Sequence, residues 1–481
     1  MKIQAQPSTT QAPRRTAAAA PPSEPIHDAL VGRVEAVAPP LRLAPPRVSL
    51  QQQVADQQNL AIQVARCAGA QIPGGLARSP EEGVEFVNQF NSELELPQDV
   101  LLRRNQLTVS SPSRFFRVNP ALFYQDVMGC YFEMSNLLDR KAPEIIIGGD
   151  CHLGNLGTMR APDGSCFWGI NDFDMAGRGS PEDDLERMAT SLLLMGLGRL
   201  QPADQDELVA GLARAYLGEL NRLADSDHTP VCGIRASEAR GEVAQLITRQ
   251  SGARQDDLLE KFTHHHHQKL KRNEELRDVE EPQASHLKAF LQHYDQDQGP
   301  TPDLRRPLQV LDIARKLESG GSTYGLNRYF ILVAGHGEEP RILELKQELP
   351  TAPEQSTGDL GQANAEHIFT GMAALGGTFD PTMAYCTIDG DAYYLRERQR
   401  EKGSLEPDKF TSLQQWRDLS EQAAVALARA HAHQAGVARA IRDWVGADQD
   451  TLIARLQHFA RVYTEQTVQD CAAYRVANKL A

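Results

Sequence analysis

Asp150, Asn155 and Asp172 have the residue types and the spacing of a site that transfers phosphoryl groups. Asn155 follows Asp150 by five positions, and the acidic residues Asp172 and Asp174 come about one β-hairpin later. In phosphotransferases an Asp accepts the proton of the substrate hydroxyl, while an Asn and a further Asp hold the Mg²⁺ that bridges the phosphates of ATP. This set suits Mg²⁺ because that cation takes one or two carboxylates together with phosphate oxygens. The spacing therefore predicts a catalytic loop and its metal-binding partner.

A glycine-rich segment and a lysine form a second group that could contact a nucleotide. The segment contains Gly320, Gly321, Ser322 and Gly325, and glycines let backbone N–H groups approach phosphate oxygens. Lys346 ends an apolar strand 21 residues beyond Gly325, where a kinase-like fold places the lysine that binds the α- and β-phosphates. The alternative is an ordinary hairpin with a lysine that keeps an edge strand soluble.

A lysine in this role needs an acidic partner. Glu366, on a helix expected over residues 363–375, is the candidate for that partner. Glu348 and Glu354 compete with it for the same role.

The residues around Asp150 resemble the Gly-Asp-x-His-x-x-Asn loop of aminoglycoside and choline kinase-like enzymes. The block after it resembles their Ile-Asp-Phe-Gly-Asp-Ala-Gly-x-Gly-Asp-Pro-x-x-Asp-Leu segment. The resemblance implies that Asp150 is the catalytic base and that Asn155 and Asp172 bind Mg²⁺, with Asp174 as a candidate second metal ligand. It also implies that Asp184 hydrogen-bonds to the backbone of the catalytic loop. The alternative is a set of Asp and Asn residues that cap turns and helices.

Composition and charge exclude several other classes of protein. The 481-residue chain has a formal net charge of −14 and a pI near 5.5, which argue against nucleic acid or an anionic membrane as the main partner. No apolar run approaches 18 residues, so we expect no membrane-spanning segment. The seven cysteines lack CxxC spacing and favour reduced thiols in a cytoplasmic protein.

The first 50 residues differ in composition from the rest. Residues 1–50 are rich in Ala, Pro, Gln, Ser and Thr and lack the apolar region of a secretory signal. We expect them to be disordered because they cannot bury enough apolar surface to offset the entropy of ordering. Their composition is similar to export leaders of bacterial proteins injected into host cells, so a cytoplasmic location and export into a host cell both stay open.

The periodicity predicts an α+β chain with two lobes. A helical lobe that carries the catalytic and metal-binding loops is expected over 51–300, a sheet-rich nucleotide-binding lobe over 301–410, and helices that complete the first lobe over 411–481. Short strands are expected next to the catalytic residues at 144–148 and 167–170. The predicted strands of the sheet-rich lobe are 328–335, 341–346, 383–388 and 391–396. The four residues His264 to His267 are expected on a solvated helix.

The order of the motifs is unusual for a kinase. In ordinary kinase folds the Gly-rich loop and its lysine precede the catalytic loop, whereas here they follow it by about 170 residues. The segment 423–432 looks like the helix that normally comes just before the catalytic loop. We therefore expect a bilobal, protein-kinase-like fold that is circularly permuted, with the chain opened between that helix and the strand at 144–148.

From about residue 100 to 476 the chain resembles the bacterial domain-of-unknown-function family 2252. The resemblance rests on stretches that include 111–117, 149–157, 171–174, 345–346, 394–396 and 428–432. The family name implies no activity. Arg117, Arg396 and Lys402 are similar to family positions and could line the cleft to hold phosphate or an acidic acceptor. Salt bridges to the acidic loop residues are the alternative for these three.

Together these patterns predict transfer of the γ-phosphoryl group from ATP–Mg²⁺ to a hydroxyl of an unidentified small molecule or protein. Two other functions stay open. One is transfer of AMP by the same residues, and the other is a nucleotide-binding pseudoenzyme that acts as an interaction module.

Overall fold

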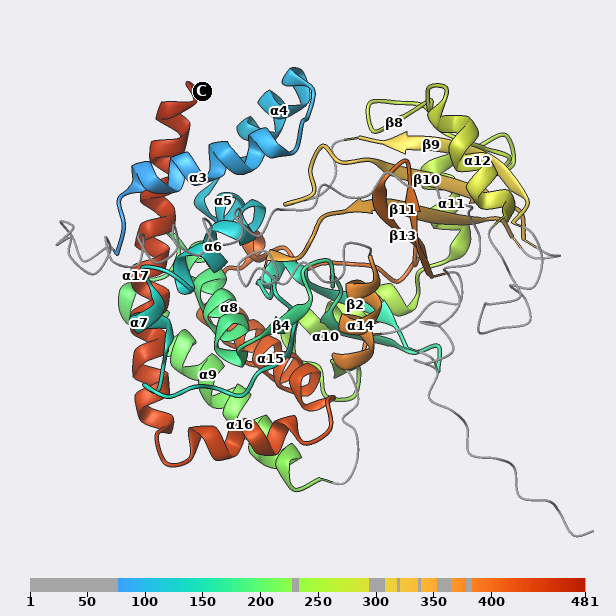
Figure 1. Ribbon diagram of the computed structural model, residues 1–481. Helices are drawn as coiled ribbons and strands as arrows, with labels where there is room; N and C mark the ends of the chain where they lie inside the picture. Colours follow the sequence, from blue (N-terminus) through green and yellow to red (C-terminus); the bar gives the residue numbers. More distant parts are fainter. Residues whose placement is uncertain are drawn as a thin grey trace, which may run out of the picture.

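The computed structural model describes residues 77–161, 163–226, 233–293, 308–317, 321–335, 339–352, 365–377 and 383–480. Three sequence expectations lie outside these residues: the disordered segment 1–50, Gly320 and Glu354. Helices and several separate sheets alternate along the described chain, which makes the fold α+β (Figure 1). None of the described helices is long and apolar enough to cross a membrane.

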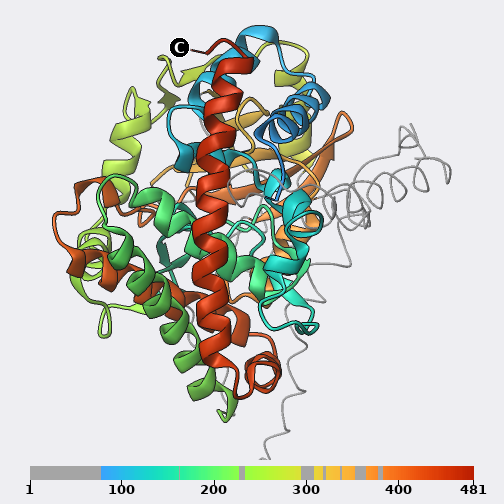
Figure 2. The ribbon, with the colours of Figure 1, turned by 90° about the vertical axis from the view of Figure 1, so that its left-hand side faces the viewer.

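Most of the helices gather in one part of the molecule, to the left in Figure 1. They are α3 (Pro80–Glu93), α4 (Gln98–Thr108), α5 (Pro112–Val118), α6 (Pro120–Val127), α7 (Phe132–Ser135), α8 (Pro181–Met195), α9 (Pro202–Ala224), α10 (Gly241–Ser251), α15 (Leu413–Ala432), α16 (Val437–Val445) and α17 (Gln449–Ala477). The long helix α17 runs the height of this part in Figure 2 and packs on α3, α8 and α9. The C-terminal helices therefore share one hydrophobic core with helices from the first half of the chain.

Short strands are embedded among these helices. The strand β1 (Ile145–Ile147) pairs with β4 (Gly177–Gly179), while β2 (Leu156–Arg160), β3 (Cys166–Ile170) and β5 (Ile234–Arg235) form a three-stranded sheet. All five residues of β3 are buried, because α10 and α15 pack against it. The strands predicted beside the catalytic residues are thus present as β1 and β3.

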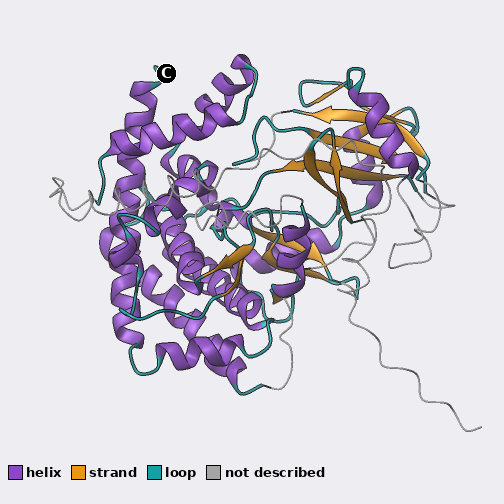
Figure 3. Cartoon of the chain, viewed as in Figure 1, coloured by secondary structure: helices purple, strands orange, loops and turns teal. Residues whose placement is uncertain are grey.

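A six-stranded antiparallel sheet makes up the other part, to the right in Figure 3. Its order is β12-β13-β11-β10-β9-β8, and the strands are β8 (Leu276–Arg277), β9 (Val310–Lys316), β10 (Arg328–Val333), β11 (Arg341–Glu348), β12 (Ala384–Ile388) and β13 (Asp391–Glu397). The four predicted strands are confirmed as β10 to β13. The strand β11 lies between β10 and β13, which places Lys346 opposite both Arg328 and Tyr394.

Two helices predicted to lie in the helical lobe pack on this sheet instead. Leu287 and Leu291 of α12 (Gln283–His293) join the side chains of one face, and Leu259 of α11 (Gln255–Phe262) joins those of the other. The sheet-rich part therefore includes residues well before 301.

The histidine run is a hairpin, and the prediction of a helix there was wrong. The strand β6 (Thr263–His264) pairs with β7 (Lys269–Leu270), and His265, His266 and His267 all have positive φ. A left-handed backbone at three successive residues is incompatible with an α-helix.

The helix α14 (Glu366–Ala374) connects the sheet-rich part to the catalytic region. In sequence it lies between β11 and β12, yet it contacts β1 in the helical part. A Cβ added at Gly371 would lie 2.2 Å from that of Ala176, so the helix packs directly against the chain that precedes β4.

Candidate active site

The loop predicted to be catalytic, residues 148–155 and called the catalytic loop below, begins at the end of β1 with two glycines. Gly149 has a φ of +73°, and a Cβ there would lie 1.7 Å from the Met175 carbonyl oxygen. Only glycine fits a left-handed backbone in so close an approach. The 3₁₀ turn Leu153–Asn155 follows, and the chain continues directly into β2. Backbone sterics thus place Asp150 and Asn155 on the two sides of one tight loop.

One face of α8 anchors this loop. The Asp184 carboxylate accepts hydrogen bonds from the backbone N–H groups of Gly148 and Gly149 at 2.8 and 3.0 Å, the contact expected from the sequence. The Ser191 hydroxyl accepts another from the Leu153 N–H group at 3.1 Å. Residues three, four and seven positions apart share a helix face, so a single helix can bind the loop at several points.

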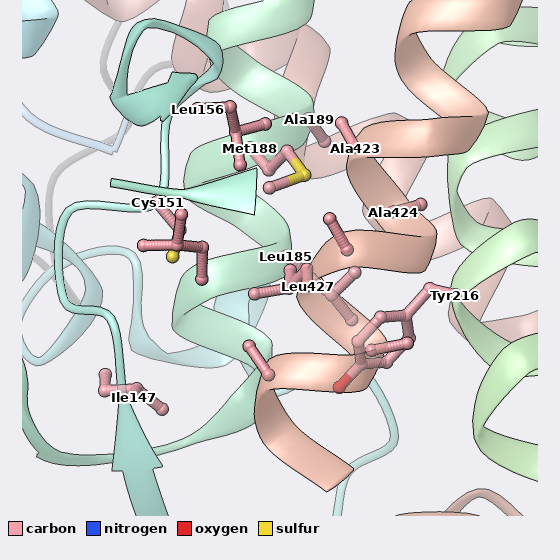
Figure 4. Close-up of a cluster of buried hydrophobic side chains, with 14 of the residues drawn as sticks. Ile147, Cys151, Leu156, Leu185, Met188, Ala189, Tyr216, Ala423, Ala424 and Leu427 are labelled. Carbon is pink, nitrogen blue, oxygen red and sulfur yellow. The ribbon is translucent and has the colours of Figure 1, made fainter. Parts of the chain in front are cut away.

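A layer of apolar side chains supports the anchor from behind. Figure 4 shows residues from the loop, α8, α9 and α15 packed together, among them Cys151, Leu185, Met188 and Leu427. A series of polar contacts extends from Asp184 into this layer. His431 Nε2 lies 3.0 Å from an Asp184 oxygen, and the Tyr216 hydroxyl lies 2.7 Å from His431 Nδ1. Buried polar groups are stable when they are paired in this way.

Asp150 is almost fully buried, and its side chain contacts three neighbours. Arg187 Nε donates a hydrogen bond to Oδ1 at 2.6 Å, Asn155 Nδ2 donates to Oδ2 at 3.3 Å, and His152 Nε2 lies 3.6 Å from Oδ2. Burial raises the pKa of the Asp150 carboxyl to about 6, although the positive charge of Arg187 opposes the rise. Burial also lowers the pKa of His152, so this histidine is neutral and packs in the loop. Asp150 can therefore accept a proton near neutral pH.

Lys346 of the sheet meets the acidic residues that follow β3. Its ammonium group forms ion pairs with Asp174 and, at 3.0 Å, with Glu348 Oε1, and all three residues are buried. Burial raises the pKa of Glu348 to about 7, while Lys346 opposes this and the Asp172 carboxylate adds to it. Asp172 thus lies close enough to act on side chains of the sheet as well as on Asp150. Two predicted motifs from distant parts of the chain meet here.

Glu366, the first candidate for the acidic partner of Lys346, does not pair with it, whereas the competing candidate Glu348 does. Lys346 pairs with Asp174 and Glu348, and no ion pair between Lys346 and Glu366 is found among the described residues. Glu348 can reach Lys346 because residues two apart on a strand project from the same face of the sheet. Glu366 lies instead in the first turn of α14, where the next residue, His367, contacts the Asp174 carbonyl oxygen at 2.9 Å.

Of the three basic residues expected in the cleft, Arg396 forms a salt bridge. Its guanidinium donates to Glu344 at 2.9 and 3.0 Å, and Arg328 binds the same carboxylate at 3.2 Å. These positive charges hold the pKa of Glu344 far below its usual range, although burial opposes them. Arg396 therefore forms a salt bridge, but with a strand residue of β11 and not with the acidic loop residues that the alternative named. Lys402 stays exposed, and Arg117 lies against the catalytic loop.

The described part of the glycine-rich segment joins β9 to β10 and rests against α4. Arg104 Nη1 donates hydrogen bonds to the carbonyl oxygens of Ser322 and Tyr324 at 2.8 and 2.9 Å. Gly325 has a φ of +97° and packs on Leu96. The segment is therefore a turn between neighbouring antiparallel strands, and it is tied to the helical part through its backbone.

The described residues contain no group of three or more His, Cys, Asp or Glu side chains arranged to hold a metal ion. The expected set differs from such a group because Asn155 is an amide and because Asp174 is engaged by Lys346. Asp174 Oδ1 is nevertheless buried without a hydrogen bond. Asp172 forms no ion pair with any described residue.

A cavity of about 960 Å³ lies beside this site and not at it. It is formed by α6, α7, the β1–β4 pair, the start of α8 and α14, and its lining includes Phe132, Arg140, Glu182 and His367. Asp150 and Lys346 do not line it. Asn155 and Asp172 do not line it either, and both are half-buried.

Two residues of the site were not identified from the sequence. Arg187 could have been found, because it lies three positions after Asp184 and must share its helix face. Arg104 has no such signal for its contacts with the glycine-rich segment, which are with backbone atoms more than 200 residues away. Its Nε also donates a hydrogen bond to Asn91 Oδ1 at 2.9 Å.

Comparison with known proteins identifies a family. Residues 95–477 match the model of DUF2252, described as an uncharacterized protein conserved in bacteria. Neither a curated protein nor a solved structure matches the chain. Because the match spans most of the sequence and includes all of the side chains described above, the chain belongs to the DUF2252 family.

Proposed function

We propose that this protein is an ATP- and Mg²⁺-dependent phosphotransferase with a circularly permuted, protein-kinase-like arrangement. The observation that carries the proposal is the ion pair between Lys346 and Asp174. It joins a strand of the six-stranded sheet to the acidic loop that follows the catalytic loop. In kinases the phosphate-binding lysine and the metal-binding Asp likewise come from two parts of the fold and act on the same nucleotide.

The order of elements in the sheet supports the same proposal. The glycine-rich turn connects β9 and β10, Lys346 lies on the next strand, and α14 follows it. Protein kinases have this order of Gly-rich loop, lysine strand and helix. The residue two positions after α15, Gln434, exchanges hydrogen bonds with the backbone of Ile146 in β1 at 2.8 and 3.0 Å. A permuted chain needs this proximity, because α15 would normally lead into the catalytic loop.

Asp150 would act as the base. In the proposed step the acceptor oxygen bonds to the γ-phosphorus of ATP, the bond from that phosphorus to the bridging oxygen breaks, and ADP leaves with the electron pair. The hydroxyl proton passes to Asp150, whose pKa of about 6 allows it to be ionised before the reaction. Arg187 fixes the orientation of the carboxylate through its bond to Oδ1.

The residues fit the cofactors that this chemistry needs. Asp172 and Asn155 supply oxygen atoms of the kind that Mg²⁺ prefers, and the buried Asp174 Oδ1 offers another beside Lys346. When bound, Mg²⁺ would neutralise the charge of the phosphates. Lys346 and the backbone of the segment 321–325 would contact the phosphates directly.

The test is a calorimetric titration of the full chain with a non-hydrolysable ATP analogue, with and without Mg²⁺. We expect metal-dependent binding that Asp172→Ala abolishes. Asp150→Asn should bind the analogue as the wild type does but should lower ATP turnover about 100-fold or more, with water as the acceptor in the absence of a known one. The variant Asp408→Ala removes an acid that is 90 % exposed and serves as the control.

The products separate phosphoryl from nucleotidyl transfer. Release of ADP supports the proposal, while release of pyrophosphate supports AMP transfer by the same residues. Absence of nucleotide binding under every condition would contradict both. Wild-type turnover in Asp150→Asn and Asp172→Ala together would show that the site lies elsewhere.

A further inference from the structure

Three arginine side chains converge on the catalytic loop. Arg114 and Arg117 lie three positions apart on α5, and Arg187 reaches the loop from α8. The charges of Arg114 and Arg187 lower the pKa of Arg117, after burial as the main cause, while Asp150 and Asp172 raise it. The acidic residues of this region therefore face a group of positive charges, of which Arg187 is fully buried and Arg114 and Arg117 are half-buried.

The donors of two of these arginines are only partly used. Arg187 Nε binds Asp150 and Nη2 donates to the Phe116 carbonyl at 3.1 Å, but Nη1 is buried without a hydrogen bond. Arg117 Nε is also buried without a hydrogen-bond partner, and Arg117 forms no ion pair with a described residue. A buried donor left unpaired is unfavourable by about 1–3 kcal/mol. Such donors in native structures need an explanation, and a bound anion that supplies the acceptor is one.

The position of Arg117 decides which ligand it would meet. A Cβ added at Gly154 would lie 2.8 Å from Arg117 Cζ, so the guanidinium rests on the catalytic loop at a point that only glycine leaves open. Its backbone carbonyl faces Gly321, with 3.6 Å to a Cβ at that residue. Arg117 thus lies between the catalytic loop and the glycine-rich segment, on the side of Asp150 and not beside Lys346.

We propose that the acceptor carries a phosphate or carboxylate group, which Arg117 binds with Arg187 beside it while the acceptor hydroxyl lies at Asp150. The role of this anion in catalysis rests on the phosphotransferase function proposed above, but its binding does not. Arginine suits the task because its planar guanidinium can donate two parallel hydrogen bonds to either group. Arg187 already forms an ion pair with the Asp150 carboxylate, so the anion would provide a negative partner for the positive charge of Arg117.

The experiment is a calorimetric titration of the full chain with inorganic phosphate, first alone and then with a saturating non-hydrolysable ATP analogue and Mg²⁺. We expect one phosphate to bind in both cases. Arg117→Ala should weaken phosphate binding about tenfold or more and leave the affinity for the analogue within about twofold. Arg178→Ala removes the same charge from a side chain that is 71 % exposed and should change neither affinity. Citrate, titrated in the same way, tests the carboxylate.

Two further variants guard against a folding defect. Gly154→Ala would push the guanidinium aside without removing it, so it should weaken phosphate binding as Arg117→Ala does. Arg117→Lys keeps the charge and should retain part of the affinity, provided that the thermal midpoint matches the wild type.

Several outcomes would overturn the proposal. These are unchanged phosphate binding in Arg117→Ala, no binding of either phosphate or citrate by the wild type, and displacement of phosphate by the ATP analogue. The last would show that the anion is the phosphate of the nucleotide itself. Phosphate binding that depends on Arg117 in a protein that binds no nucleotide would support the anion site and contradict the phosphotransferase function.

Discussion

The catalytic loop and the glycine-rich segment contribute to the same site but are held by different interactions. The catalytic loop, residues 148–155, hydrogen-bonds through its backbone to Asp184 and Ser191 of α8, and a continuous hydrophobic layer lies behind it. The glycine-rich segment is held by hydrogen bonds from Arg104 and by packing of Gly325 on Leu96, and the strand beyond it by the ion pairs of Lys346.

The catalytic loop, residues 148–155, is therefore a fixed half of the proposed site. The glycine-rich segment and Lys346 form an exchangeable half, in which a ligand can replace existing partners. Backbone bonds to a buried helix give the catalytic loop its geometry without any ligand, and such preorganisation is what positions a base. Lys346, in contrast, is neutralised by Asp174 and Glu348. A phosphate can replace one of these carboxylates as a partner of the lysine, so we expect nucleotide binding to rearrange the sheet side and leave the loop unchanged.

The largest expected effect comes from breaking the fixed half. Asp184→Ala would leave the N–H groups of Gly148 and Gly149 without acceptors and remove the partner of His431. Because buried unpaired donors are unfavourable by about 1–3 kcal/mol each, we expect the free energy of unfolding to fall by about 3 kcal/mol or more. Urea denaturation followed by circular dichroism measures this, with Asp408→Ala as the control. A loss below 1 kcal/mol would mean that the loop is fixed by something other than α8.

The exchangeable half is tested at its lysine. Lys346→Met keeps the length of the side chain but removes the ammonium group, so we expect the affinity for ATP–Mg²⁺ to fall about 100-fold, or about 2.7 kcal/mol. Equilibrium titration of the ATP analogue measures it. Lys288→Met, on an exposed position of α12, is the matched control. If Lys346→Met bound nucleotide as the wild type does, the ion pairs of Lys346 would be purely structural.

The pH dependence tests the base in the fixed half. Burial raises the pKa of Asp150 to about 6, and a base must be ionised to accept a proton. Turnover should therefore fall about tenfold per unit as the pH drops below about 6, and it should level off above that value. Arg187→Met removes a charge that lowers this pKa, so the acidic limb of the profile should move to higher pH. A pH profile that is flat from 5 to 8 would exclude Asp150 as the base.

Much of the sheet and of the catalytic loop could be predicted because their signals are local. The strands β10 to β13 alternate or cluster apolar residues, and β1 leads into its loop through two glycines. The left-handed turn at His265 to His267 has no glycine to mark it, so the sequence pattern predicts a helix there. The short strand β8 is only two residues long, too short for a periodic pattern to show.

The contacts between the two parts could be predicted only in outline. The kinase-like resemblance predicts that Lys346 and the acidic block line one cleft, but it does not predict the ion pair with Asp174. Glu348, a competing candidate for the partner of the lysine, lies on the same strand and projects from the same face. Contacts between a long side chain and backbone oxygens cannot be predicted from the spacing of residues, because any backbone carbonyl can accept a hydrogen bond. Arg104 is of this kind, and it therefore offers a test that is independent of the motifs.

Arg104→Met should have the smallest effect and should act on the exchangeable half alone. The change preserves packing on α4 but removes the two hydrogen bonds to the carbonyls of Ser322 and Tyr324, together with the one from Nε to Asn91 Oδ1. We expect the affinity for the ATP analogue to fall about fivefold, or about 1 kcal/mol, because the glycine-rich segment must then be ordered by the nucleotide. The pH profile of turnover should keep its limb near 6, since Asp150 is held by α8. Arg103→Met, on the neighbouring exposed position, is the control. A shift in that limb, without a change in affinity, would mean that the two halves are coupled and that the distinction between them is wrong.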